Sequence, residues 1–366
     1  MKVLLTGGGT AGHINPAIAV ANYIKEKEKN AQFLFVGTKH GLEKELVPKS
    51  GYDIKYIDVM GLRRKLTAEN IAVFFKYIKS MGDAGKIINS FKPDIVIGTG
   101  GYVCAPVIKA AHRKKIPTLI HEQNVFPGLA VKMLAKDADV TAVSFKETMN
   151  MIRAKKMILT GNPLRPDLFL PVDKKDIARG FGFDDKPIAL MFGGSLGSAK
   201  MNDALVELLS HGIERCNLIA ATGERYYDEV AARLKKRGLN VKELNNAAVL
   251  PYIYNMEKIF GAADIIIGRA GAITVSEITA MGKAAVLIPS PNVAHNHQEY
   301  NARYLEKNGA AAVISESELS GEKLLLKTAE ILKNENSLEK MRAASKALGI
   351  KDACETIYKT VKGLVR

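Results

Sequence analysis

Two glycine-rich turns, nearly half the chain apart, constrain the fold of this 366-residue chain more than any other feature. Each follows an apolar run and precedes a stretch with helical spacing: the first spans residues 6–13 and the second residues 193–198. A strand, a glycine turn and a helix in this order direct backbone N–H groups and the positive end of the helix at an anion. The repetition predicts two nucleotide-binding domains that act on a phosphorylated ligand.

The rest of the chain alternates short apolar runs with helical stretches in both halves. This pattern is typical of an α/β fold in which helices cover both faces of doubly wound parallel sheets. Prolines at positions 163 and 166 interrupt the alternation and mark a domain boundary. We therefore expect one Rossmann-like domain over residues 1–162 and a second over residues 163–344, with a C-terminal helix over 345–366 packed on the first.

Positive charge is concentrated in the first of these domains. Residues 1–162 hold 25 lysines and arginines against 13 acidic residues, whereas the remainder holds 28 against 25. A basic domain suits nucleic acid, an anionic membrane or a phosphorylated substrate. The sequence has no arginine-rich tail, zinc finger or RNA-recognition signature, so we do not expect nucleic acid as a partner. No apolar run approaches the ~18 residues of a membrane span, and we expect a cytoplasmic protein.

The first glycine turn matches the dinucleotide-binding spacing at Gly7, Gly9 and Gly12. That fingerprint also needs a carboxylate after the second strand, and the segment that follows strand 32–37 reaches Lys39 without one, which argues against NAD. His13 closes the turn where a helix begins. Because a helix start disfavours imidazolium, His13 should be neutral near pH 7, as a general base must be. A loop histidine that only binds backbone is the alternative.

Polar or glycine-rich segments follow three other predicted strands, at the sheet edge where open α/β folds bind ligands. The first two are residues 98–103 and 121–124, and the latter contains Glu122, a rival candidate base. In the second half, strand 265–267 leads into a helix start in which Glu277 could reach ribose hydroxyls, although such a residue is often a solvated helix position. No carboxylate cluster occupies such an edge, so we expect no metal and no cofactor.

A predicted helix near residues 69–90 carries both apolar and basic side chains. An apolar stripe usually packs on its own sheet, but phenylalanines bordered by bases also describe a helix that contacts anionic lipid. The candidate membrane contacts are Arg63, Arg64, Lys65, Ile71, Phe74, Phe75, Lys76, Ile78 and Lys79.

Taken in order along the chain, these motifs resemble the MurG family of bacterial N-acetylglucosaminyltransferases, which convert lipid I to lipid II in peptidoglycan synthesis. The resemblance covers the whole chain. It rests on residues 8–13, 100–103, 121–124, 161–165, 193–195, 270–277, 297–298 and 301–302.

The resemblance implies a GT-B fold with two domains facing a central cleft, and an inverting transfer from UDP-N-acetylglucosamine to the 4-hydroxyl of lipid I. It implies a peripheral protein on the cytoplasmic face of the cell membrane, with roles in wall growth, cell shape and division. The acceptor diphosphate would meet the loops of Gly8, Gly9, Gly100, Gly101 and Tyr102. The implied donor-binding residues are Thr10, Ala11, Gly12, Asn124, Arg165, Ser195, Ile253, Ala272, Ile273, Thr274, Val275, Ser276, Glu277 and Gln298.

One position departs from the family pattern, and two other functions remain open. The family often has glutamine after the serine of the second glycine turn, where this chain has Leu196. A UDP-sugar epimerase of similar two-domain fold is the nearest rival, and a non-enzymatic lipid-binding scaffold is the third possibility. Transfer of a labelled sugar to a lipid-linked acceptor would distinguish a glycosyltransferase from both the epimerase and the scaffold.

Overall fold

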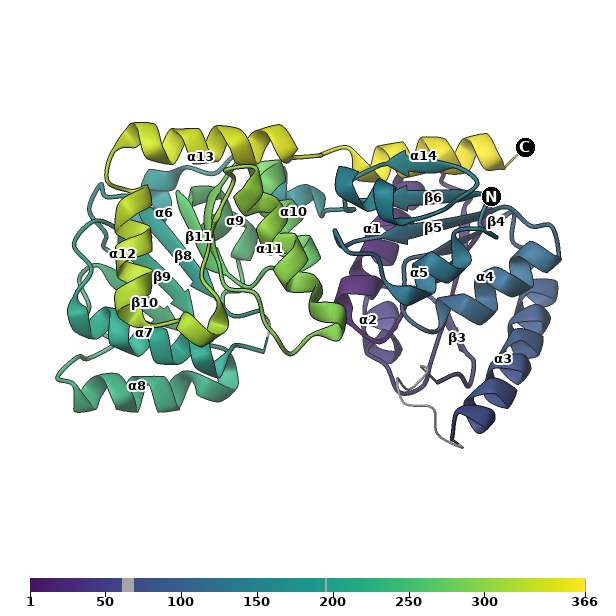
Figure 1. Cartoon of the computed structure of the whole chain (residues 1–366), viewed down its shortest axis with the longest axis horizontal. Helices are drawn as coiled ribbons and strands as arrows, with labels where there is room; N and C mark the ends of the chain where they lie inside the picture. The colour runs from purple at the N-terminus through teal and green to yellow at the C-terminus, as the bar shows by residue number, and fades with distance from the viewer. Residues whose placement is uncertain (61–68, 195, 366) are drawn as a thin grey trace. The chain divides into compact units, whose positions relative to one another are not determined.

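The computed structural model describes residues 1–60, 69–194 and 196–365, and its internal contacts divide the chain into two compact units (Figure 1). The first unit comprises residues 1–164 and 350–366, and the second comprises residues 165–349. Each unit is built on a fully parallel sheet. The predicted α/β class with doubly wound sheets is confirmed.

The first unit has a seven-stranded sheet in the order β3-β2-β1-β4-β5-β6-β7. The strand order reverses between β1 and β4, and such a switch point opens a crevice at the carboxyl ends of the strands. Its strands are Lys2–Thr6 (β1), Gln32–Gly37 (β2), Ile54–Tyr56 (β3), Ile95–Gly98 (β4), Thr118–Glu122 (β5), Val140–Val143 (β6) and Met157–Leu159 (β7). Its helices are Ala11–Lys27 (α1), Glu43–Lys49 (α2), Glu69–Phe91 (α3), Cys104–Arg113 (α4), Leu129–Leu134 (α5) and Ala353–Leu364 (α14), with a 3-10 turn at Lys146–Met151 (η1).

Both faces of this sheet are covered, which explains why its strands read as continuous apolar runs. One face packs against α3, α4 and α5, and the other against α1, α2 and α14. On α1 the fully buried side chains of Ile14, Val20 and Ile24 recur at helical spacing and form one apolar face. The sheet thus fixes the start of α1 directly behind the first glycine turn.

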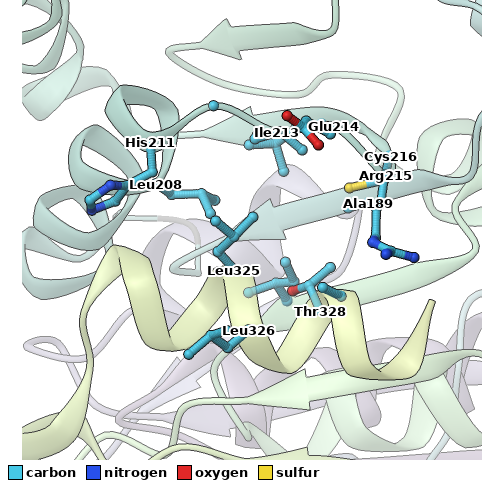
Figure 2. A pocket seen from close by; sticks show the side chains of 14 residues that line it. Ala189, Leu208, His211, Ile213, Glu214, Arg215, Cys216, Leu325, Leu326 and Thr328 are labelled. Atoms are coloured by element: carbon cyan, nitrogen blue, oxygen red, sulfur yellow. The ribbon is translucent and has the colours of Figure 1, made fainter. Parts of the chain in front are cut away.

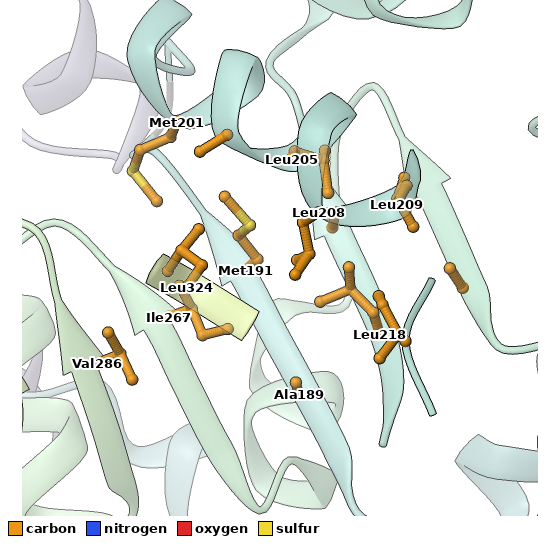
Figure 3. Packing of buried hydrophobic residues seen from close by; sticks show 14 of the residues in the cluster. Ala189, Met191, Met201, Leu205, Leu208, Leu209, Leu218, Ile267, Val286 and Leu324 are labelled. Carbon is orange, nitrogen blue, oxygen red and sulfur yellow. The ribbon is translucent and has the colours of Figure 1, made fainter. Parts of the chain in front are cut away.

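The second unit repeats the design with a six-stranded sheet in the order β10-β9-β8-β11-β12-β13. Figure 3 shows side chains of β8, β11 and β12, among them Met191, Ile267 and Val286, meeting α7 and α12 in its core. Its strands are Ile188–Phe192 (β8), Asn217–Ala221 (β9), Ala247–Leu250 (β10), Ile265–Gly268 (β11), Ala284–Leu287 (β12) and Ala312–Val313 (β13). Its helices are Lys174–Gly180 (α6), Ala199–His211 (α7), Tyr227–Lys236 (α8), Met256–Ala262 (α9), Ala272–Met281 (α10), His297–Lys307 (α11), Gly321–Ile331 (α12) and Glu335–Leu348 (α13), with 3-10 turns at Pro166–Phe169 (η2), Glu224–Tyr226 (η3), Ala294–Asn296 (η4) and Glu316–Glu318 (η5).

The C-terminal segment differs from the single helix expected over residues 345–366. Residues 345–348 end α13 in the second unit, where the Ser345 hydroxyl donates to the Ile278 carbonyl. Helix α13 ends before Gly349, where only glycine fits because a side chain would lie 2.3 Å from the Thr279 carbonyl oxygen. Beyond it α14 packs on α1 in the first unit, and Tyr358 and Lys362 both donate to Glu28. The boundaries therefore fall after residues 164 and 349 instead of 162 and 344.

Candidate active site

The first glycine turn brings His13 to the switch point of the first sheet. His13 is the third residue of α1, and its ring nitrogen Nδ1 lies 3.1 Å from the Gly8 carbonyl oxygen and 3.3 Å from the Thr10 hydroxyl. A carbonyl oxygen can only accept, so Nδ1 carries the proton and the lone pair of the neutral ring is on Nε2. This is the nitrogen that could take a proton from a substrate.

The glycine segment after β4 packs directly against this turn. A side chain on Gly101 would come within 2.4 Å of the Gly8 carbonyl oxygen, and one on Gly100 within 2.7 Å of the His13 ring. Both glycines have positive φ, at +82° and +108°, which side chains disfavour. Tyr102 borders Gly9 in the same place. The predicted acceptor-loop residues Gly8, Gly9, Gly100, Gly101 and Tyr102 therefore lie together with Thr10, Ala11, Gly12 and His13.

Glu122, the rival candidate base, is a buried residue that organises the next loop. Its Oε1 accepts from the backbone N–H and the side chain of Asn124, at 2.9 and 3.3 Å, and its Oε2 accepts from the Gly128 N–H at 2.8 Å. Burial raises the pKa of the Glu122 carboxyl, although these donors oppose the change. Because both oxygens are engaged inside the protein, Glu122 suits proton transfer less well than His13.

A buried amide and imidazole tie this loop to the rest of the site. The Gln123 side chain donates to the Thr99 carbonyl at 2.7 Å and to His121 Nδ1 at 2.9 Å. His121 in turn donates from Nε2 to the Gly161 carbonyl at 2.9 Å. Burial lowers the pKa of His121 to about 4, so its ring is neutral and structural near pH 7. The polar residues 121–123 thus hold the loop, and Asn124 is the partly exposed member.

Sequence reasoning missed Glu43, the first residue of α2. Its buried carboxylate accepts from the Gly9 N–H at 3.0 Å and from Thr38 through both the backbone and the hydroxyl group. Glu43 lies four residues after Lys39 and so falls beyond the end of the second strand, where the dinucleotide fingerprint has its carboxylate. The glycines at positions 37 and 41 are the sequence feature that accompanies Glu43, because a side chain at either position would collide with it.

The second glycine turn precedes α7, and part of it lies outside the described residues. Ser195 is the position concerned, so its predicted contact with the donor has no structural description. Ser198 caps α7 by accepting from the Met201 N–H. Arg269, after β11, donates to Ser198 at 2.6 Å and to the Ile288 carbonyl at 3.2 Å, and also pairs with Glu316. This half-buried arginine was not singled out from the sequence.

Glu277 and Arg165 face each other in the second unit. The guanidinium of Arg165 is 3.9 Å from the Glu277 carboxylate, 3.8 Å from Glu257 and 3.6 Å from Asp167. Burial raises the pKa of Glu277 to about 7, and the positive charge of Arg165 only partly offsets it. Glu277 lies one turn into α10, whose first turn comprises Ala272, Ile273, Thr274, Val275 and Ser276 and begins after Gly271.

The two remaining donor candidates also follow strands of the second sheet. Ile253 is a buried residue after β10, between the exposed rings of Tyr252 and Tyr254, whose centroids are 5.0 Å apart. Gln298 is the second residue of α11, after a segment in which His295 and Asn296 have positive φ, and its Oε1 accepts from the Ser290 N–H at 2.9 Å. The described candidates of this unit therefore lie beyond the carboxyl ends of β10, β11 and β12, or next to them, as Arg165 does.

The candidate membrane helix is described only in part. Arg63, Arg64 and Lys65 lie outside the described residues, and for Ile71 and Phe74 only their place in α3 is described. Phe75 and Ile78 are exposed, at 65% and 46%, and Lys79 is exposed beside them. Lys76 pairs with Asp58 at 3.4 Å. None of the described helices combines the length and apolarity of a membrane span.

A cavity of about 350 Å³ lies elsewhere in the second unit (Figure 2). Its walls come from the end of α7, the loop before β9 and α12, including Leu208, Ile213, Arg215 and Leu325. This is the amino-terminal end of the sheet, whereas the predicted donor residues follow the carboxyl ends. The cavity is therefore separate from the candidate site.

Comparison with protein families decides the class of this chain. The model of the glycosyltransferase family 28 N-terminal domain matches residues 3–143, and that of the family 28 C-terminal domain matches residues 188–357. The chain belongs to glycosyltransferase family 28. A Thermoanaerobacter (strain X514) member is 49% identical over the full length of both chains, and a Bacillus licheniformis member is 41% identical over 100% of this chain and 99% of its own. Both are UDP-N-acetylglucosamine–N-acetylmuramyl-(pentapeptide) pyrophosphoryl-undecaprenol N-acetylglucosamine transferases.

Solved structures of family 28 and of other enzymes share the fold. The crystal structure of Acinetobacter baumannii MurG matches with a TM-score of 0.80 and 30% identity over 99% of both chains. The fold is GT-B, as the motifs implied. UDP-GlcNAc 2-epimerase from Neisseria meningitidis matches with a TM-score of 0.68 at 15% identity, covering 99% of this chain and 100% of its own, and shows only that the fold is shared.

Proposed function

We propose that this family 28 enzyme transfers N-acetylglucosamine from UDP-N-acetylglucosamine to the 4-hydroxyl of the N-acetylmuramyl-pentapeptide of undecaprenyl-diphosphate lipid I, with inversion. The observation that carries the proposal is identity of 41–49% over the full length of named transferases. The grouping of candidate residues beyond the carboxyl ends of the strands in each sheet supports it.

In the proposed reaction His13 is the general base. The acceptor hydroxyl loses its proton to Nε2 as its oxygen attacks the anomeric carbon and the bond to UDP breaks. The N–H groups at the start of α1 and the positive end of that helix favour the negative charge of the lipid diphosphate. The tautomer and position of His13 support its assignment as the base. The carboxylate oxygens of Glu122 accept from the N–H groups of Asn124 and Gly128, which weakens the rival assignment.

The second unit is the proposed donor domain. Glu277 accepts from the ribose hydroxyls, Ile253 meets the uracil edge through its backbone, and Gln298 meets the sugar. The start of α10, Ser195 and Arg165 stabilise the charge that develops on the UDP leaving group. Thr10, Ala11, Gly12 and Asn124 are the proposed donor-binding residues of the first unit.

The decisive experiment supplies UDP-N-acetylglucosamine labelled in the sugar together with a lipid I analogue. The proposal expects label in the lipid-linked product and release of one UDP for each sugar transferred. Label that stays in a free UDP-sugar with an inverted ring centre would instead identify an epimerase. Binding of lipid without turnover would indicate a scaffold.

We expect transfer to continue at an unchanged rate after treatment with EDTA. We propose that helix-end N–H groups and the guanidinium of Arg165 stabilise the charge on the leaving group. The described residues contain no cluster of three His, Cys, Asp or Glu side chains that could hold a metal. Asp137 and Asp139 have the spacing of the DxD motif that holds a metal in some sugar-nucleotide enzymes. However, Asp137 pairs with Lys109 and Asp139 accepts from Thr118, so both are engaged in the fold. Complete loss of activity that Mg²⁺ restores would contradict this expectation.

The first unit is also proposed to contact the anionic surface of the cytoplasmic leaflet through α3. Replacing Phe75 and Ile78 together with serine should weaken sedimentation with phosphatidylglycerol vesicles by about tenfold, because less apolar surface enters the interface. Serine at Leu170, an equally exposed residue of the second unit, is the matched control. Equal binding by the double variant and the wild type would remove α3 from the membrane contact.

A further inference from the structure

One peptide group in the first glycine turn connects His13 to a buried carboxylate. The carbonyl oxygen of the Gly8–Gly9 peptide lies 3.1 Å from His13 Nδ1, and the N–H of the same peptide donates to Glu43 Oε2 at 3.0 Å. We propose that Glu43 is a positioning residue that fixes the tautomer and raises the basicity of His13 through this peptide. We call the three groups the Glu43–His13 relay. The proposal rests on the proposed role of His13 as base.

The relay works by polarisation. A negative carboxylate on the N–H side of a peptide draws the proton toward itself and leaves more negative charge on the carbonyl oxygen. That oxygen then accepts more strongly from Nδ1–H, and the gain is larger when the ring is imidazolium than when it is neutral. Glu43 therefore opposes the start of α1, which disfavours positive charge on His13.

Several contacts keep Glu43 charged and in place. Its Oε1 accepts from the Thr38 N–H at 2.9 Å and from the Thr38 hydroxyl at 2.7 Å. Burial by itself would raise the pKa of Glu43, but the donors from Gly9 and Thr38 together lower it below its ordinary value. The side chain is 1% exposed, so the charge acts in a medium that screens it little.

Glycines around the Gly8–Gly9 peptide allow it to lie close to Glu43 on one side and to Gly101 on the other. A side chain on Gly8 would lie 2.7 Å from Glu43 Oε1, and side chains on Gly37 and Gly41 would lie within 2.5 Å of other Glu43 atoms. From the opposite side, Gly101 approaches the Gly8 carbonyl oxygen so closely that a side chain would reach 2.4 Å. These glycines are therefore required for the close contacts of the relay, in addition to any role in binding a phosphate.

The other titratable groups around the turn do not supply the same effect. Cys104 donates to the carbonyls of Gly100 and Thr6, and burial raises its pKa to about 12, so its thiol is neutral. Tyr102 borders Gly9 with its ring. Of the described residues that contact this turn, Glu43 is the one whose carboxylate is hydrogen-bonded to it.

The test is Glu43→Gln in the full-length chain, with the pKa of His13 followed by NMR. Thr38 presents two hydrogens to Oε1, so the amide oxygen takes that place and the amide NH₂ faces the Gly9 N–H. The pKa of His13 should fall by about half a unit to one unit. The acidic limb of the kcat profile should move to lower pH by the same amount, and the plateau should drop roughly 3- to 10-fold because the base is weaker.

Thr38→Val is the matched control. It removes one donor to the same carboxylate but keeps the bond from Gly9, so the pKa of His13 should stay at its wild-type value. An equal fall in both variants would mean that general loosening of the turn is responsible, and an unchanged pKa in Glu43→Gln would make Glu43 a purely structural residue. Either result overturns the relay.

A measurement on the wild type covers the case in which Glu43→Gln does not fold. Ring nitrogen shifts of neutral His13 should report a proton on Nδ1, and a proton on Nε2 would overturn the relay directly. These readings are independent of the proposed function. If His13→Ala retains full turnover, the assignment of the base fails while tautomer and pKa still test the relay.

Discussion

Replacing His13 with alanine should lower kcat for sugar transfer by about 10²–10⁴-fold at saturating acceptor, the usual contribution of a general base. Because Nδ1–H is directed at the Gly8 carbonyl, Nε2 is the nitrogen that we propose takes the acceptor proton. The acidic limb of the kcat profile should also disappear, since that limb reports protonation of the base. Steady-state kinetics from pH 5 to pH 9 measures both effects.

An exposed histidine of the same unit provides the control. His40→Ala changes the charge of the surface without touching the turn, and its kcat and pH profile should match the wild type. If His13→Ala raises only the KM for the acceptor and leaves kcat and the acidic limb in place, His13 binds the diphosphate. The base must then be sought elsewhere, with Glu122 as the first candidate.

Glu277→Ala should weaken binding of UDP-N-acetylglucosamine by about 1–3 kcal/mol, or roughly 5- to 150-fold in Kd, the cost of removing a charged partner from a hydrogen bond. Isothermal titration calorimetry on the folded variant measures the change. Glu257→Ala is the control, because Glu257 also approaches Arg165 but from α9. Equal Kd values for Glu277→Ala and the wild type would leave Glu277 with only a structural role.

Donor affinity should depend on pH through the same residue. Burial raises the pKa of Glu277 to about 7, so the carboxylate that we propose accepts from the ribose hydroxyls forms only as the pH rises through that value. Affinity should therefore increase from pH 5.5 to 7.5 and then level off. The free energy of unfolding should change in the opposite sense: a proton retained by the folded state stabilises it at low pH, and this contribution is lost between the ordinary pKa and about 7. Glu277→Gln should remove both dependences.

The fold was predictable because its signals are local. Apolar runs such as residues 3–5 are buried on both faces of a parallel sheet, so they carry no polar alternation. Glycine turns follow them where strands end, and the carboxyl ends of parallel strands meet at one edge. The grouping of His13 with Gly100 and Gly101 follows from that geometry, although the tautomer of His13 required atomic positions.

The residues that sequence analysis missed act over long separations. Glu43 binds the N–H of Gly9, 34 positions earlier, and Arg269 binds Ser198, 71 positions earlier. Neither separation leaves a periodic signature. The C-terminal boundary differs from the expected one because residues 345–348 belong to α13, which packs in the second unit, and the chain passes to the first unit only after Gly349. The sequence thus predicts the helices, the strands and the sheet edge where the candidate site lies. Hydrogen bonds between residues far apart in the chain can be identified only in the structure.

The placement of α14 has a consequence for how the protein is made. Ile357 and Val361 are fully buried in the core of the first unit, yet the whole second unit precedes them in the sequence. On the ribosome the first unit is therefore the first to emerge and the last to be completed. Until residues 353–364 arrive, the face of α1 that they cover is exposed to water. The second unit, continuous from residue 165 to 349, can finish its core while the first still waits for its final helix.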